Sequence, residues 1–91
     1  MDKTEARSVL KQKLNEFATR PYSDLVALID KPVDVTVTGT SGTSYGIEFN
    51  MFYDSHLTGD LRIIGSIDDG GWRAWFPLTE TLIMKSNGKF V

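Results

Sequence analysis

The sequence predicts an α+β fold of two layers, in which two N-terminal helices pack on one face of a four- to five-stranded antiparallel meander sheet. Three observations predict it. Apolar side chains in the first third of the chain recur at helical spacing, later segments alternate apolar and polar residues as strands do, and the connections are short. A chain of 91 residues forms one domain, so we treat residues 1–91 as a unit with a single core.

The helices are predicted over residues 4–19 and 21–29. In the first, four apolar side chains follow the spacing of one helical face: Ala6, Leu10, Leu14 and Phe17. Pro21 separates the two helices, because proline suits the first turn of a helix and interrupts its interior. The Asp-Lys-Pro sequence at residues 30–32 then ends the second helix.

The strands are predicted from β-branched and aromatic residues that alternate with polar ones, over residues 32–38, 44–53, 61–67, 72–77 and 81–85. Short connections make neighbouring strands antiparallel. The segment 79–85 has an alternative, a short helix capped by Thr79, and we prefer the strand. Asn87-Gly88 predicts a last type I′ turn, which leads into Phe90 and Val91.

The segment from Leu61 to Leu78 predicts a β-hairpin, because Asp69-Gly70 supplies the residues that a type I′ turn requires. This loop would pair Ile67 with Trp72 and Ile63 with Phe76. The side chains expected toward the helices are Leu61, Ile63, Gly65, Ile67, Trp72, Ala74, Phe76 and Leu78. The side chains expected on the outer face are Arg62, Ile64, Ser66, Arg73 and Trp75.

Charge and composition narrow the classes of function. Residues 1–20 carry a net charge of +2, residues 21–80 carry −6 and residues 81–91 carry +2. An acidic sheet region argues against a nucleic-acid partner, which needs a basic surface. No long apolar run predicts a membrane span, and the charged, periodic N-terminus does not resemble a secretory signal, so we expect a cytoplasmic protein. With one histidine, no cysteine and dispersed carboxylates, we expect no metal and no cofactor.

A polar end of the sheet is the candidate for catalysis. His56 is the only histidine, and its unperturbed pKa lies near neutrality. Asp54, Asp60 and Glu80 are predicted at the same end, where a carboxylate could orient His56 as a general base. The alternative is a solvated loop in which the two aspartates cap turns, and we favour it because no known catalytic spacing is present.

The outer sheet face is the candidate for an interface. Phe52 is expected to join Ile64 and Trp75 there, with Arg62 and Arg73 beside them. Aromatic anchors with arginine and a polar rim are typical of protein interfaces. The concrete hypothesis is a homodimer formed by two sheets that stack face to face, and the alternative partner is an unidentified protein.

We therefore interpret the chain as a small, soluble, non-enzymatic interaction module that self-associates through the outer sheet face. The alternative is a small enzyme or ligand-binding protein that uses the end with Asp54, His56, Asp60 and Glu80. No motif in the sequence identifies a specific activity, substrate or partner.

Overall fold

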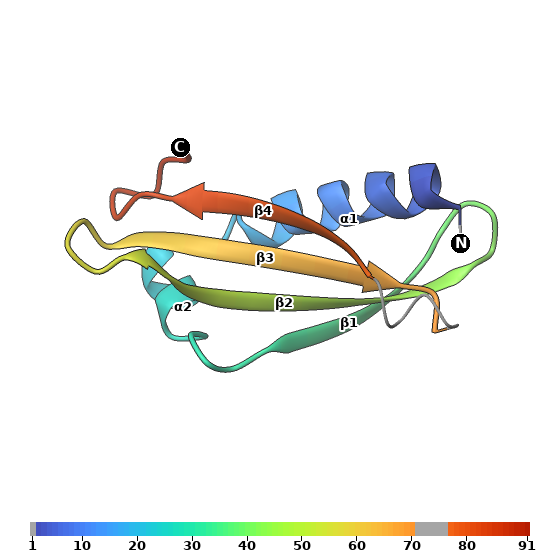
Figure 1. The fold of residues 1–91 in the computed structure, drawn as a ribbon, viewed down its shortest axis with the longest axis horizontal. Helices are drawn as coiled ribbons and strands as arrows, with labels where there is room; N and C mark the ends of the chain where they lie inside the picture. The colour runs from blue at the N-terminus through green and yellow to red at the C-terminus, as the bar shows by residue number, and fades with distance from the viewer. Residues whose placement is uncertain (1, 71–76) are drawn as a thin grey trace.

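The structure is a computed structural model that describes residues 2–70 and 77–91, and it has the two-layer α+β fold predicted (Figure 1). Its elements are α1 (Lys3–Phe17), α2 (Tyr22–Val26), β1 (Val33–Thr38), β2 (Ser44–Ser55), β3 (Asp60–Asp68) and β4 (Leu78–Met84). The four strands form one antiparallel sheet in the order β1-β2-β3-β4, which is the predicted meander. Both helices lie on the same face of this sheet.

Helix α1 forms as its sequence predicts. Asp2 caps the helix, since its carboxylate accepts a hydrogen bond of 3.0 Å from the backbone N–H of Glu5. The buried side chains of α1 are the four of the predicted face: Ala6, Leu10, Leu14 and Phe17. The helix comes close to the sheet at Gly65, where a Cβ atom would lie 2.9 Å from Cδ1 of Leu10. The missing side chain at this position lets α1 pack directly on β3.

Helix α2 is shorter than the predicted range of 21–29. Its α-helical bonds stop at Val26, and the chain continues in tighter turns, as the hydrogen bond from the Ile29 N–H to the Val26 carbonyl shows. Asp30 then takes a φ of 63°, a left-handed conformation that ends the turns. The prediction located this helix correctly but missed its early end.

The pairing of β3 differs from the predicted hairpin. Ile67 lies opposite Leu78 and Ile63 lies opposite Leu82, so the predicted partners Trp72 and Phe76 are wrong. The shift is six residues, an even number, and it therefore leaves the described side chains Leu61, Ile63, Ile67 and Leu78 on their predicted face. The observed register packs Leu78, Leu82 and Met84 of β4 with the core, whereas the prediction used only the local turn signal of Asp69-Gly70. The predicted strand 72–77 lies almost wholly outside the described residues.

The segment after β4 folds back along it as predicted, but not through the predicted type I′ turn, because that turn requires a positive φ at Asn87 and, among the described non-glycine residues, Asp30 alone has one. Gly88 has a φ of 86°, and the N–H of Lys85 donates to the Lys89 carbonyl at 2.7 Å. The N–H of Val91 donates to the carbonyl of Ile83 at 2.9 Å, and Phe90 forms a bridge with Met84. The C-terminal residues thus pair with the outer edge of β4. Of the alternatives for residues 79–85, the strand is correct.

The core lies between α1 and the inner face of β2, β3 and β4. Its sheet residues alternate along each strand, and those buried in β2 and β3 are Tyr45, Ile47, Phe49, Met51, Leu61, Ile63 and Ile67. The edge strand β1 turns three valines toward this face, but they are only partly buried. The single long helix therefore covers one half of the sheet well and the other half incompletely. No helix in the described ranges has the length and apolar character needed to cross a membrane.

Candidate functional site

The predicted polar end is occupied by structural interactions. Asp54 accepts two hydrogen bonds from Arg62, of 2.9 Å from Nε and 2.6 Å from Nη2, across the β2–β3 pair. The ring of His56 packs against the ring of Tyr53, with centroids 4.9 Å apart. In the part of the chain that the structure describes, His56 donates no hydrogen bond to a carboxylate. The Asp54 carboxylate is committed to Arg62 and does not orient the imidazole.

Glu80 lies away from this end, which corrects its predicted place. It pairs with Gly65 in the middle of β3, about 13 Å along the strand from Leu61, at ~3.3 Å per residue. Its side chain points toward α1, where Arg7 Nε lies 3.7 Å from its carboxylate. The prediction failed because residues 78–84 form the next strand and do not connect strands at the end of the sheet.

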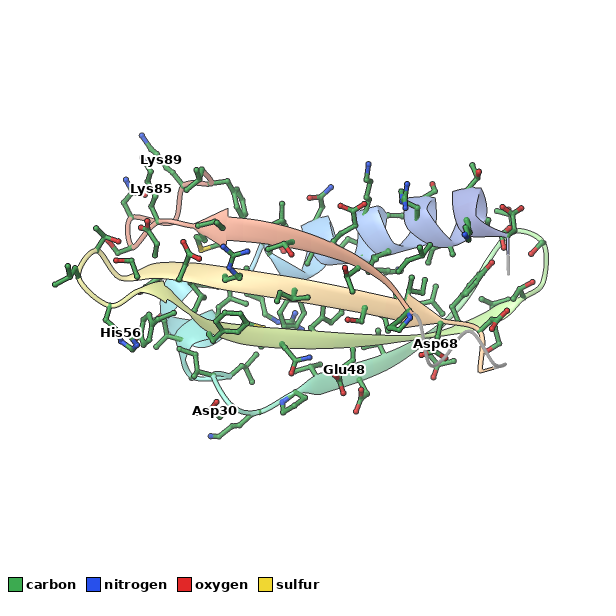
Figure 2. All side chains as sticks on the ribbon, viewed as in Figure 1. Asp30, Glu48, His56, Asp68, Lys85 and Lys89 are labelled. Atoms are coloured by element: carbon green, nitrogen blue, oxygen red, sulfur yellow. The ribbon has the colours of Figure 1, made fainter. Side chains whose placement is uncertain are left out.

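The loop that carries His56 is held by α2. Tyr22 donates a hydrogen bond of 2.5 Å to the carbonyl of Gly59, and Gly59 has a φ of 76°. Burial raises the pKa of the Tyr22 hydroxyl, so it stays protonated as a donor. Figure 2 shows His56 at the same end of the molecule as Lys85 and Lys89, and Asp68 near the other end. Within residues 2–70 and 77–91, no group of three or more histidine and acidic side chains could hold a metal ion.

The described part of the outer face holds an apolar cluster, which we call the outer cluster: Phe52, Ile64 and Ile83. Arg62 lies directly opposite both Phe52 and Ile83, and Ile64 is the diagonal neighbour of each. Phe52 is 42% exposed, and neither described helix lies over this face. Two of the predicted interface residues, Trp75 and Arg73, lie outside the described residues.

Polar groups surround the outer cluster. Arg62, which lies directly opposite Phe52 on the next strand, forms an ion pair with Asp54, and Asn50 donates a hydrogen bond of 2.8 Å to the carboxylate of Glu48. Toward β1 the outer face becomes wholly polar, with Asp34, Thr36 and Thr38 opposite β2. The apolar part of this face is thus confined to β2, β3 and β4. Sequence reasoning found Phe52 and Ile64 but missed Ile83, because it placed 72–77 beside β3.

Another polar cluster joins α1 to the β1–β2 loop. The Glu5 carboxylate accepts hydrogen bonds from the Ser41 hydroxyl at 2.6 Å, the Ser41 N–H at 3.0 Å, Thr40 at 3.2 Å and Tyr45 at 2.6 Å. These bonds, that of the Ser41 hydroxyl first, lower the pKa of Glu5 from 4.5 to about 2. The bond to Glu5 raises the pKa of Tyr45 to about 12. We call these four residues the Glu5 tie.

The Glu5 tie is structural in character. Its carboxylate already accepts four hydrogen bonds, so little capacity is left for a ligand. Gly39 lies under it, where a Cβ atom would come 2.6 Å from the Glu5 carboxylate. Sequence reasoning missed this cluster, because nothing in the pattern of a helix and a remote Ser-Thr loop indicates that they meet.

Comparison with protein-family models, with curated proteins and with solved structures gives no match for this chain. Any function proposed for this chain therefore rests on the geometry of its own residues. At the predicted polar end, no hydrogen bond joins His56 to a carboxylate within the described residues. The outer face does place the described members of the predicted interface next to one another, since Phe52 lies opposite Arg62 and Ile64 lies diagonal to Phe52.

Proposed function

We propose that this chain is a cytoplasmic, non-enzymatic interaction module that self-associates through the outer face of its sheet. The exposure of Phe52 carries the proposal. This phenylalanine is 42% exposed and lies diagonal to Ile64, with Ile83 on the far side of Arg62, and no helix of the described residues covers this face. Exposed aromatic groups beside an arginine and within a polar rim are the anchors that protein interfaces use.

Face-to-face stacking is the arrangement that fits this surface. Two sheets of this kind pack about 10 Å apart, and their facing side chains interdigitate. A twofold axis near Ile64 would bring the outer cluster of one copy against that of the other. The Arg62–Asp54 ion pair already neutralises the charge beside Phe52, so stacking would not bury an unpaired arginine.

The substitution Ile64→Lys tests the proposal. We expect the wild-type protein to be an oligomer and the variant to have half the particle mass, because a charge in the centre of the outer cluster cannot be buried unpaired. Light scattering coupled to size-exclusion chromatography measures the mass. Circular dichroism checks that the variant is folded, which we expect because Ile64 is only partly buried.

The matched control is Gln12→Lys, which adds the same charge at an exposed position of α1. It should leave the particle mass unchanged. A wild-type chain that stays monomeric at high concentration, or an Ile64→Lys variant with wild-type mass, would contradict the proposal.

A further inference from the structure

The free edge of β1 has little of the usual protection against pairing with another strand, since Asp34 is its one charged residue and Pro32 lies just before it. Among the described residues β1 pairs with β2 alone, and its other edge offers unpaired backbone groups over Val33–Thr38. Natural edge strands are protected by charged side chains, lysine above all, by proline, by inward-pointing charges, by bulges or by covering segments. The sequence of β1, VDVTVT, contains no lysine, and its register with β2 is regular.

The inner face beside this edge is also open. Val35 is 36% exposed, although it points to the same face as the buried Phe49 and Ile47. A hollow of about 520 Å³ lies between the end of α1 and β1, and Val35 and Val37 line it. Its other wall is the stack of Phe17 on Phe49, with ring centroids 4.4 Å apart. Within the described chain, therefore, no segment covers the inner side of β1 fully.

From these observations we propose that β1 pairs antiparallel with β1 of a second copy of this chain, about a twofold axis at Val35. The two sheets would join into one continuous sheet of eight strands. The interface is separate from the outer cluster, because it uses the edge of the sheet and not its outer face. It does not depend on the function proposed above.

The sequence of β1 is complementary to itself in this register. With the axis at Val35, the two Val35 side chains lie opposite each other, Val33 lies opposite Val37, and Asp34 lies opposite Thr36. All three valines of each copy then meet valines on the inner face. An axis at Asp34 would place the two carboxylates opposite each other, where like charges repel. An axis at Thr36 would leave Val33 opposite Gly39.

The opposite edge explains why the second copy is the partner and why the assembly ends at two copies along the sheet. On β4, Glu80 points inward, and Val91 and Phe90 pair with Ile83 and Met84. A chain with two open edges would pair head to tail into a filament. Here the C-terminal residues pair with the Ile83–Met84 end of β4 and Glu80 disfavours pairing along the rest, so we expect the chain to close as a twofold dimer through β1.

A cysteine scan tests the pairing directly, because the chain has no cysteine of its own. Opposed residues in an antiparallel pair have Cα atoms about 4.5–5.5 Å apart, within the reach of a disulfide. We expect Val35→Cys to form a disulfide-linked dimer in at least half of the chains under mild oxidation. Gln12→Cys, exposed on α1, should stay largely monomeric under the same conditions.

A charge-pair experiment checks the same contact without oxidation. Val35→Lys and Val35→Glu should each lose the edge dimer, since like charges would face each other across the axis. An equimolar mixture of the two variants should recover it as a heterodimer, which native mass spectrometry resolves. Circular dichroism of each variant verifies folding, and Gln12→Lys serves as the matched control.

The outcomes separate this inference from the proposed function. If both interfaces form, the wild type is a tetramer, Val35→Lys and Ile64→Lys are each dimers, and the double variant is a monomer. If Val35→Cys crosslinks no more than Gln12→Cys, or the mixed charges recover no dimer, the edge pairing is wrong. If Val35→Cys crosslinks while Ile64→Lys keeps the wild-type mass, the edge pairing stands and the outer-face proposal is wrong.

Discussion

The two edge strands of this sheet differ in how the chain shields them. Strand β4 is packed by α1 on its inner face, holds the inward-pointing Glu80, and is paired at its end by Phe90 and Val91. Strand β1 has only partial cover from α1, and Val35 remains 36% exposed. A single long helix cannot cover four strands. Helix α1 covers the side of the sheet that ends in β4, and the β1 edge therefore stays accessible to another strand. Association with another chain is therefore expected at the uncovered half of the sheet, which ends in β1.

The largest effect on stability is expected from shortening a side chain that packs between α1 and the sheet. Leu10 is fully buried against Gly65, so Leu10→Ala should reduce the free energy of unfolding by about 2–5 kcal/mol. Val35→Ala, on the open half, should cost less than about 1 kcal/mol when the protein is monomeric. Urea unfolding of both variants at low protein concentration measures the difference. Equal losses would show that the two halves of the sheet are equally well packed, which would contradict the difference between β4 and β1.

A smaller effect on stability, but a visible one on assembly, is expected from removing the protection of β4. Glu80→Val replaces an inward-pointing charge with a β-branched residue, so β4 should accept another strand more readily. The loss of the half-exposed Arg7 ion pair should cost no more than about 1 kcal/mol. We expect a particle mass at least twice that of the wild type by light scattering.

Glu80→Gln is the control for this change, because it removes the charge and keeps a polar side chain beside α1. It should associate less than Glu80→Val does. Wild-type mass for Glu80→Val would mean that the C-terminal residues alone protect the edge.

The smallest effect is expected at the Glu5 tie, on the side of the molecule that leads into β1, because three of its hydrogen bonds are exposed to solvent; it is measured through the pH dependence of stability. The pKa of Glu5 in the folded protein, about 2, lies below its ordinary value of 4.5, so the tie stabilises the protein above that ordinary value. This stability should be lost as the pH falls from about 4.5 toward 2. Glu5→Gln should flatten that part of the stability curve, as measured by thermal unfolding across pH.

Glu16→Gln, on the same helix, is the control and should keep the wild-type acid dependence. The Tyr45 hydroxyl affects the alkaline side of the dependence of stability on pH. Because its folded-state pKa is raised from 10.0 to about 12, its contribution should be lost as the pH rises through that interval. An unchanged acid limb in Glu5→Gln would show that the tie does not contribute to stability.

The fold could be predicted because its signals are local and agree with one another. The face of α1, the alternation in β2 and β3 and the turn at Gly88 all follow from periodicity and turn chemistry. The register of β3 with β4 could not be predicted in this way. Asp69-Gly70 fits the composition of a two-residue hairpin turn. The observed register instead pairs Ile67 with Leu78 and packs Leu82 and Met84 with the core, and this packing is not visible in the local sequence.

The candidate sites depended even more on tertiary packing. Glu80 was misplaced for the same reason as the register, since a shift along β3 moves a residue from the end of the sheet to its middle. The Glu5 tie joins a helix to a distant loop, and periodicity carries no information on such contacts. Phe52 and Ile64 were found because the period of two in a strand assigns faces whatever the register.

The Glu5 tie also bears on the order in which the molecule folds. Its partners in sequence, Glu5 and Ser41, are separated by 36 residues, whereas β2 and β3 are joined by residues 56–59 alone. Closing a long loop costs more entropy than closing a short one, so we expect the β2–β3 hairpin to form before the N-terminal helix docks. The hydrogen bonds of Glu5 would then form late in folding, after the transition state. Glu5→Gln should therefore accelerate unfolding and leave the rate of folding nearly unchanged.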